Sequence, residues 1–312
     1  MSKLKALLLT EGLHGMISQT EGLAKALNFD YIHEKIELNS FWKLIPTSFT
    51  PVKKFVFKNQ IEQDFDVIIS CGRKSIIPSL FLKKKSKKKI INIHIQNPKI
   101  ALKHFDFVVC PEHDDLEGPN VLSTKGAIHY LTHEEINNSK DYLLNKLERD
   151  KDVITLILGG PNKYYNYSDE NMISIFSIIN RMLKEHNLQL IVIPSNRTPK
   201  KTIELSKEYF TDNRTVIDVV DKSAYLSSLA LSKYLVVTCD STSMISEAAL
   251  TGKPVYVAMI PALRNDKRFQ RFRSLFEKLN IIKILENKLE TWNYEKLNEA
   301  DRIALEIKRK IN

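Results

Sequence analysis

Short apolar runs rich in valine and isoleucine alternate with longer amphipathic stretches along the whole chain. Continuous apolar runs favour buried strands, whereas apolar positions spaced three or four residues apart favour helices. In the first part of the chain the pattern predicts strands at 4–10, 30–37, 66–70, 89–95, 105–110 and 121–123, and helices at 17–27 and 74–82. This alternation is typical of a parallel sheet covered by helices.

The polar stretch 134–151 interrupts the rhythm and is expected to be helical. A second series follows it, with strands predicted at 153–158, 189–193, 215–219, 234–237 and 254–259, and helices at 168–186, 199–210, 223–232 and 243–251. Apolar positions in the tail predict a last helix over 293–311.

The two series predict an α/β protein built from two Rossmann-like, doubly wound domains that face a cleft. A length of 312 residues agrees with two domains. We divide the chain into an N-terminal, acceptor-side domain at 1–136, a linker helix at 137–150, a C-terminal domain at 151–292 and a C-terminal helix at 293–312. In such folds ligands bind outside the carboxyl ends of the strands, so the loops that follow the strands are the places to look for chemistry.

The composition is that of a globular protein, with 43% hydrophobic and 27% charged residues, and it excludes a disordered or fibrous chain. No apolar run approaches the roughly 20 residues that a membrane helix needs. Cys71, Cys110 and Cys239 are scattered without metal-ligand spacing. They favour reduced thiols in a cytoplasmic protein over a disulfide framework or a zinc site.

The chain carries a net charge of +10, and six lysines fall in the run 83–89. Such a run is either a solvated turn or a contact for anionic lipid or a phosphorylated partner. No nucleic-acid-binding motif surrounds it, so we expect no nucleic-acid partner. The stretch 41–58 interleaves aromatic residues, prolines and lysines, which suits either a covered loop and helix or a membrane-interface surface. The lysine run 83–89 and the stretch 41–58 together suggest the hypothesis of peripheral membrane contact.

The most informative segment follows the strand predicted at 234–237, where Asp240-Ser241-Thr242-Ser243 leads directly into a helix that carries Glu247. Hydroxyls and unpaired backbone N–H groups at a helix start form an anion site that the helix dipole strengthens. Glu247, about one turn further, is placed to accept hydrogen bonds from a ribose diol. Plain N-capping by one hydroxyl is the alternative, but three consecutive hydroxyl residues favour a ligand.

Two other loops of the second half are candidate binding loops. Gly159 and Gly160, with Asn162, follow one strand, where glycines let the backbone approach a phosphate or base closely. Ser195 and Arg197 follow the next strand, where an arginine is placed for bidentate phosphate binding. An ordinary turn and a surface arginine are the respective alternatives.

In the first half, three titratable residues at strand ends are candidates for the catalytic base: Glu11, His14 and His113. The alternative for Glu11 and His14 is a glycine-containing turn with an incidental histidine. There is no GxxxxGK[ST], GxGxxG or HExxH motif. Asp64 and Asp66 have the Asp-x-Asp spacing of a metal motif, but they precede a predicted strand instead of following one. We expect no essential metal ion.

Several of these motifs resemble the mitochondrial-fission ELM-type family, in particular its bacterial members, a GT-B-like group of predicted nucleoside-diphosphate-sugar enzymes. The resemblance covers nearly the whole chain. The matching positions are Glu11, Gly12, Gly15, Gln19, Gly22, Leu23, Gly72-Arg73, Gln96-Asn97-Pro98, Phe105-Asp106, Pro111–Asp114, Gly126-Ala127, Gly159-Gly160, Arg197–Pro199, Asp240–Pro254, Lys267–Phe269 and Phe272. The family more usually has Asp at the first acidic position, and often His where Met16 stands.

The resemblance implies a GT-B architecture with the sugar nucleotide on the C-terminal domain and a final helix that crosses back to the N-terminal one. In similar glycosyltransferases the helix glutamate binds the ribose and the preceding small polar residues bind the diphosphate, roles that Glu247 and Ser241–Ser243 match. The resemblance also implies an alternative function. Plant relatives are associated with recruitment of fission machinery, so the protein could be a non-catalytic adaptor that recruits a partner to a membrane.

From these residues we predict a metal-independent GT-B glycosyltransferase that uses a nucleoside-diphosphate sugar, needs no further cofactor and acts on a membrane-associated or lipid-linked acceptor. The adaptor and a nucleotide-sugar 2-epimerase are the alternatives. The sequence leaves the oligomeric state open.

Overall fold

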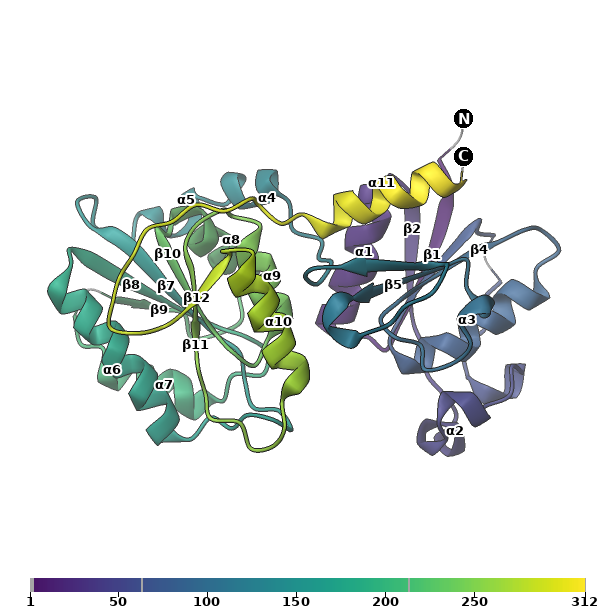
Figure 1. The fold of residues 1–312 in the computed structure, drawn as a ribbon, viewed down its shortest axis with the longest axis horizontal. Helices are drawn as coiled ribbons and strands as arrows, with labels where there is room; N and C mark the ends of the chain where they lie inside the picture. Colours follow the sequence, from purple (N-terminus) through teal and green to yellow (C-terminus); the bar gives the residue numbers. More distant parts are fainter. Residues whose placement is uncertain (1–2, 63, 213, 312) are drawn as a thin grey trace. The chain divides into compact units, whose positions relative to one another are not determined.

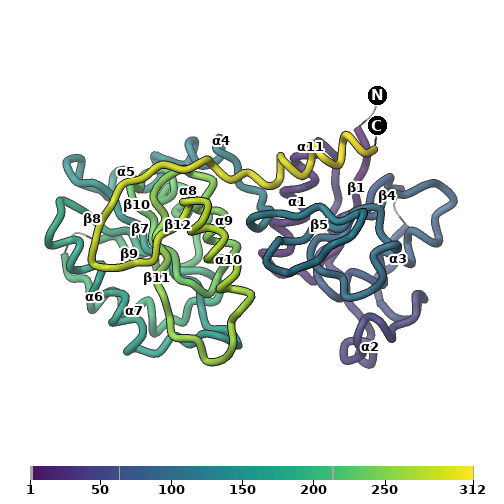
Figure 2. Tube along the Cα trace, in the orientation of Figure 1, coloured from purple at the N-terminus to yellow at the C-terminus, as the bar shows by residue number. Residues whose placement is uncertain are grey.

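A computed structural model describes residues 3–62, 64–212 and 214–311. The chain forms two compact units, unit 1 (Met1–Tyr130 with Asn298–Asn312) and unit 2 (Leu131–Leu297). Each is built on its own six-stranded sheet, and all strand pairs in both sheets are parallel. The prediction of two doubly wound α/β halves is confirmed (Figures 1 and 2).

Unit 1 contains strands β1 to β6, helices α1 to α3 and α11, and four short 3-10 turns. Their bounds are β1 Lys5–Thr10, α1 His14–Leu27, β2 Asp30–Lys35, α2 Ser40–Leu44, η1 Thr47–Phe49, η2 Lys54–Val56, β3 Val67–Cys71, α3 Arg73–Lys85, β4 Ile91–Ile95, η3 Leu102–His104, β5 Phe107–Pro111, η4 Glu112–Asp114, β6 Val121–Thr124 and α11 Glu299–Ile311.

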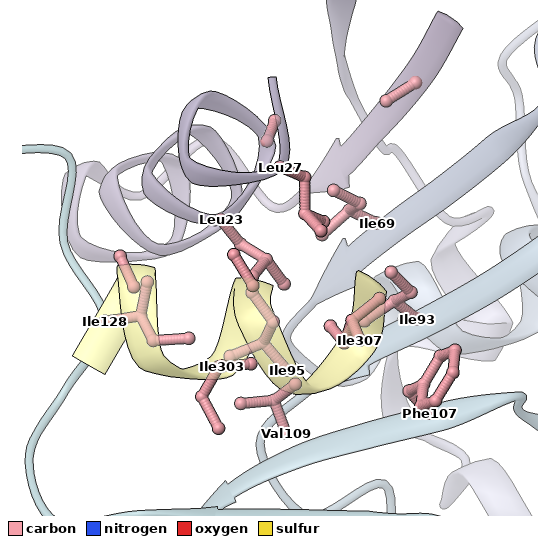
Figure 3. Close-up of a cluster of buried hydrophobic side chains, with 14 of the residues drawn as sticks. Leu23, Leu27, Ile69, Ile93, Ile95, Phe107, Val109, Ile128, Ile303 and Ile307 are labelled. Carbon is pink, nitrogen blue, oxygen red and sulfur yellow. The ribbon is translucent and has the colours of Figure 1, made fainter. Parts of the chain in front are cut away.

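The sheet of unit 1 has the order β2-β1-β3-β4-β5-β6 and is covered on both faces. Alternate residues of β1 point to opposite faces: Leu8 joins the cluster under α1 and α11, and Leu7 joins the cluster under α3. In Figure 3 Ile303 and Ile307 of α11 lie against Leu23 of α1 and the strand residues of this cluster. The last helix of the chain therefore belongs to the core of unit 1.

Unit 2 contains strands β7 to β12 and helices α4 to α10. Their bounds are α4 His133–Asn138, α5 Asp141–Leu144, β7 Asp152–Leu158, α6 Asp169–Glu185, β8 Leu188–Pro194, α7 Lys200–Tyr209, β9 Arg214–Val216, α8 Lys222–Leu231, β10 Tyr234–Thr238, α9 Thr242–Ala249, β11 Val255–Ala258, α10 Lys267–Lys278 and β12 Ile282–Ile284.

The sheet of unit 2 has the order β12-β11-β10-β7-β8-β9. Counted from β7, this is the strand order 3-2-1-4-5-6 of the Rossmann fold, in which the chain reverses direction between β7 and β10. β10, β7 and β8 are neighbours and are buried almost throughout. Their carboxyl ends therefore bring three loops together at the point where dinucleotides bind in this topology.

Helix α6 illustrates how the sequence produces these elements. Ser168 caps its start by accepting a hydrogen bond from the Asn171 backbone N–H (3.3 Å). Buried apolar residues then follow at helical spacing: Met172, Ile175, Phe176, Ile179 and Met182.

Three features differ from the sequence-based prediction. Unit 1 ends at Tyr130 instead of 136, and the single linker helix expected at 137–150 is replaced by the short helices α4 and α5, with only Ile136 and Leu143 buried. So few buried positions give no continuous apolar face for one long helix. The last helix begins at Glu299 instead of 293, after Asn298, whose side chain accepts from the Asp301 N–H.

Within the described ranges, no helix is long and apolar enough to cross a membrane. The three cysteines are buried, and none is in a disulfide.

Candidate functional site

The candidate site of unit 2 is formed by the loops that follow β7, β8 and β10. Gly159 and Gly160 follow β7, Ser195 and Arg197 follow β8, and Asp240 follows β10. Because these strands are neighbours, the structure brings together the loops that the sequence analysis treated as separate motifs.

The Asp240 carboxylate connects the three loops. Its side chain is fully buried. It accepts hydrogen bonds from the Gly160 backbone N–H (3.1 Å), from Arg197 Nη2 (2.8 Å) and from the Tyr167 hydroxyl (2.5 Å). Burial and the neighbouring Asp240 raise the pKa of Tyr167, which keeps this phenol protonated and donating. A single carboxylate thus fixes the loop after β7 to the loop after β8.

Arg197 is held at the surface of this network. Its Nη2 pairs with Asp240, and its Nη1 donates to the Gly160 carbonyl oxygen (2.9 Å). The side chain is still 43% exposed. The guanidinium therefore has a fixed orientation while part of it faces solvent, which suits recognition of an anion.

The two glycines permit close packing within the protein. A Cβ on Gly159 would lie 2.3 Å from Asp240 Oδ2, and a Cβ on Gly160 would lie 2.1 Å from the Arg197 carbonyl oxygen. The close approach that the sequence analysis assigned to a phosphate is here made by Asp240 and by the backbone at Arg197. Phosphate binding by these glycines stays a prediction.

We expect Gly160→Ala to lower the free energy of unfolding by about 2 kcal/mol, because the added methyl must displace backbone. The matched control is Gly15→Ala in α1, where nothing lies within 4 Å of the new Cβ and alanine favours the helix by about 0.5–1 kcal/mol. Urea denaturation measures both variants. Equal unfolding midpoints would contradict the close packing at Gly160.

Ser195 and Asn162 hold loop backbone in place. Ser195 Oγ donates to the Gly159 carbonyl oxygen (2.8 Å). Asn162 Oδ1 accepts from the backbone N–H groups of Tyr164 (2.8 Å) and Tyr165 (3.2 Å). Ser195 Oγ also lies 3.2 Å from Thr198 Oγ1. Contact of Ser195 and Asn162 with a substrate stays a prediction.

Helix α9 begins at Thr242, two residues after Asp240. Ser241 is its N-cap, and its hydroxyl accepts from the Met244 N–H (3.4 Å). Thr242 and Ser243 open the helix and are half-buried. The first N–H groups of a helix have no intrahelical acceptor, so this end of α9 offers donors to an anion next to the Arg197 guanidinium.

Glu247 lies inside α9 and is 9% exposed. Its Oε2 accepts a hydrogen bond from the Tyr225 hydroxyl of α8 (2.7 Å). Burial raises the pKa of this carboxyl from its ordinary 4.5 to about 7, against the lowering effect of the Tyr225 hydrogen bond. The carboxyl is therefore near its midpoint of titration at neutral pH and suits an exchangeable hydrogen-bonding role.

In unit 1, Glu11 is bound to the start of α3. Its Oε2 pairs with Lys74 Nζ (2.6 Å), and its Oε1 accepts from the Lys74 backbone N–H (3.1 Å). β1 and β3 are the strands between which the chain reverses direction in this sheet. Glu11 thus lies at the place in unit 1 where ligands bind in such sheets, and it already has a cationic partner.

The two histidine candidates lie apart in unit 1. His14 is the exposed first residue of α1, with its ring 6.0 Å from that of Tyr130. His113 is buried in η4 after β5, and its Nε2 is 3.9 Å from Asp114 Oδ1. β1 and β5 are three strand positions apart, about 14 Å at the usual spacing. The structure therefore does not gather Glu11, His14 and His113 into one catalytic cluster.

Asp240, Tyr167 and Tyr225 are site residues whose roles were not predicted from the sequence. The signal for Asp240 was its position between a buried strand and three hydroxyl residues. The two tyrosines gave no signal, because each becomes a site residue only through contact with an element distant in the sequence.

No group of three or more His, Cys, Asp or Glu side chains that could hold a metal ion occurs in the part of the chain that the structure describes. Asp64 and Asp66 both pair with Lys88 (2.6 and 2.9 Å).

The whole chain resembles several solved structures. S. aureus MnaA, solved with UDP, is 14% identical with a TM-score of 0.54, covering 97% of this chain and 88% of MnaA. UDP-GlcNAc 2-epimerase from Neisseria meningitidis, bound to UDP-GlcNAc, is 12% identical with a TM-score of 0.54 (98% and 100%). Acinetobacter baumannii MurG is 12% identical with a TM-score of 0.51 (99% and 90%). The protein therefore has the GT-B fold shared by glycosyltransferases and UDP-sugar epimerases.

The particular family follows from the sequence. The profile of the family described as Mitochondrial fission ELM1 matches residues 14–311, and the chain belongs to that family. Uncharacterized protein RP120 of Rickettsia prowazekii (strain Madrid E) is 27% identical, covering 94% of this chain and 95% of RP120. Mitochondrial fission protein ELM1 of Arabidopsis thaliana is 24% identical, covering 78% of this chain and 64% of the plant protein.

Proposed function

We propose that unit 2 binds a nucleoside-diphosphate sugar at the carboxyl ends of β7, β8 and β10. The observation that carries this proposal is the fixed Arg197 guanidinium, held by buried Asp240 beside the start of α9. An oriented guanidinium and free helix N–H groups together favour a diphosphate. The solved structures of the same fold that contain UDP or UDP-GlcNAc support this choice of ligand.

In this proposal Arg197, Ser241, Thr242 and Ser243 hold the diphosphate and Glu247 holds the ribose. Gly159, Gly160, Asn162 and Ser195 shape the loops beside the phosphates or the sugar. The ion pair with buried Asp240 holds the Arg197 guanidinium in one orientation. We therefore propose that Arg197 orients the ligand as well as attracting it. Glu247 accepts hydrogen bonds from ribose hydroxyls when ionised.

The reaction we propose is metal-independent glycosyl transfer. A base of unit 1 (Glu11, His14 or His113) takes the proton of an acceptor hydroxyl, and the acceptor oxygen bonds to the sugar carbon as its bond to the diphosphate breaks. The helix N–H groups and Arg197 then stabilise the charge on the leaving diphosphate. We propose a cytoplasmic protein whose acceptor lies at the inner face of a membrane, in agreement with its buried, reduced cysteines.

A thermal-shift panel of nucleotides and nucleotide sugars tests ligand binding directly. A cognate ligand at about 100 times its Kd should stabilise the protein by about 2.7 kcal/mol and raise its melting temperature. A flat panel would contradict nucleotide-sugar binding and would favour the non-catalytic adaptor.

Arg197→Ala is expected to weaken binding of the ligand found in that panel at least tenfold, or about 1.4 kcal/mol. The reason is the loss of the oriented guanidinium beside α9. Arg181→Ala, an exposed arginine on α6, is the matched control and should leave affinity unchanged. Calorimetry measures both, and equal affinities of the two variants would remove Arg197 from the binding site.

A nucleotide-sugar 2-epimerase is a second candidate, because the N. meningitidis structure of the same fold is a 2-epimerase. Product analysis separates the two reactions. Epimerisation proceeds without an acceptor and returns an isomeric nucleotide sugar, whereas transfer releases the nucleoside diphosphate.

A further inference from the structure

The segment between β2 and β3 of unit 1 exposes four large apolar side chains. Phe41 is 64% exposed, Leu44 85%, Phe49 78% and Phe55 58%. We call these four residues the aromatic ridge. Isolated exposed apolar residues are ordinary, but four large ones within fifteen positions of a folded segment are not. Figure 1 shows α2, which carries two of them, away from the sheet of unit 1.

Two of the ridge residues, Phe41 and Phe55, lie beside a half-buried tryptophan. The Phe41 ring is 4.9 Å from that of Trp42, which in turn is 5.8 Å from that of Phe55. Phe41 and Leu44 are three residues apart on α2 and so lie on one face of it. Trp42 packs against the core under α3. Phe41 and Phe55 therefore lie against a tryptophan that is itself packed on the core.

Hydrogen bonds fix the backbone that presents the ridge. Arg73 of α3 donates to the carbonyl oxygens of Lys43 and Ile45, the latter at 2.8 Å. Asn39 Nδ2 donates to the Phe55 carbonyl oxygen (2.6 Å), and the Asn39 N–H donates to that of Val56 (3.0 Å). The fold thus holds these apolar side chains in solvent through specific contacts.

The charge within the ridge segment, residues 39–60, has one sign. Between Leu38 and Ile61 the sequence has four lysines and no Asp or Glu, and Lys43 and Lys53 are exposed. Lys54 of this segment lines a cavity of about 220 Å³ together with Lys85, which belongs to the lysine run 83–89. Glu62 lines the same cavity. In the run, Lys83 pairs with Asp106, and Lys88 pairs with Asp64 and Asp66, so the uniformly positive stretch is the ridge segment 39–60 itself.

We propose that unit 1 docks on an anionic lipid bilayer by inserting the aromatic ridge between headgroups, with Lys43, Lys53 and the exposed lysines of the run against lipid phosphates. Aromatic and leucine side chains with flanking lysines match the chemistry of the bilayer interface. The uniform positive charge of the segment 39–60 favours lipid over a protein partner, whose apolar contact is normally rimmed by mixed polar groups. The inference concerns unit 1 alone and does not depend on nucleotide-sugar binding by unit 2.

Vesicle flotation of the full chain tests this docking. Wild-type protein should float with vesicles of phosphatidylcholine and phosphatidylglycerol, and should stay in solution with phosphatidylcholine alone. Leu44→Ser with Phe49→Ser removes two exposed side chains and should lower partitioning at least tenfold. Leu305→Ser, a 56% exposed leucine on α11 of unit 1, is the matched control and should float like wild type.

A charge variant separates insertion from general attraction. Lys43→Glu with Lys53→Glu should lower partitioning at least tenfold, since each lysine beside an anionic surface contributes about fivefold. Lys103→Glu, an exposed lysine of η3, should have a smaller effect. Absence of flotation by the wild type would overturn the proposal and favour a protein partner. Flotation that the serine variant retains would overturn the insertion of the ridge.

Discussion

Replacing Asp240 with alanine is expected to lower the free energy of unfolding by about 3 kcal/mol and to abolish nucleotide-sugar binding. The Gly160 N–H would lose an acceptor in a buried position, at about 1–3 kcal/mol. The Tyr167 hydroxyl would lose a charged acceptor and keep its hydrogen bond to Thr238 Oγ1 (2.8 Å). The loss of the Arg197–Asp240 ion pair adds little to this destabilisation, because the Arg197 side chain is 43% exposed and water can solvate its guanidinium. Ligand binding fails because the guanidinium and the loop after β7 are no longer fixed.

Urea denaturation and calorimetry measure the two effects of Asp240→Ala separately. Tyr167→Phe removes one of the three hydrogen bonds that Asp240 accepts, together with the hydrogen bond from Tyr167 to Thr238 Oγ1, and should have an intermediate effect on unfolding. Asp218→Ala is the control, since that carboxylate is exposed and pairs with a surface lysine, at less than about 1 kcal/mol. An Asp240 variant as stable as the Asp218 variant would show that the carboxylate does not hold the three loops together.

Glu247→Gln is expected to make the protein more stable than wild type above neutral pH and equally stable in acid. Burial raises the pKa of the native carboxyl to about 7 from an ordinary 4.5. Between these values the native state binds more protons than the unfolded state, so stability falls as pH rises. The stabilisation that the protonated Glu247 carboxyl gives the native state amounts to about 3 kcal/mol. It is fully present below about pH 4.5 and is lost as the pH rises to about 7. Glutamine stays neutral throughout.

Denaturation curves across this pH range measure the difference between wild type and Glu247→Gln. Glu185→Gln, at the exposed end of α6, is the control and should give a pH profile parallel to that of wild type. Parallel profiles for Glu247→Gln and wild type would mean that Glu247 titrates normally and is not buried in a neutral form. The same glutamine variant should also bind the nucleotide sugar more weakly, because it loses an acceptor for ribose hydroxyls.

Much of the fold was predictable because the apolar periodicity is strong. The buried strands β1, β3, β7, β8 and β10 are continuous apolar runs, and their positions agree with the prediction within about two residues. The segment 134–151 was harder, since charged residues support a helix locally while only Ile136 and Leu143 are buried. The start of the last helix depends on an Asn298 cap that periodicity does not reveal.

Sequence position located the binding loops of unit 2 but not their internal contacts. Thr242 and Glu247 belong to one helix, so their separation in the sequence was enough to predict that both belong to the same site. The contact of Asp240 with Tyr167 joins residues 73 positions apart and follows from strand order. In unit 1 the same limitation applies: nothing local to Glu11 indicates the lysine that pairs with it, and nothing local to His113 indicates that β5 lies three strands from β1.

Amide hydrogen exchange with and without UDP-GlcNAc tests most directly whether unit 2 carries a nucleotide-sugar site at these strand ends. We expect slower exchange in the loops after β7 and β8 and at the start of α9, and less slowing of these amides in the Arg197→Ala variant at the same ligand concentration. If UDP-GlcNAc does not raise the melting temperature in the thermal-shift panel, the exchange experiment is repeated with each of the other nucleotide sugars of that panel. Protection confined to other parts of the chain, or no protection with any of them, would contradict a nucleotide-sugar site at Arg197 and α9.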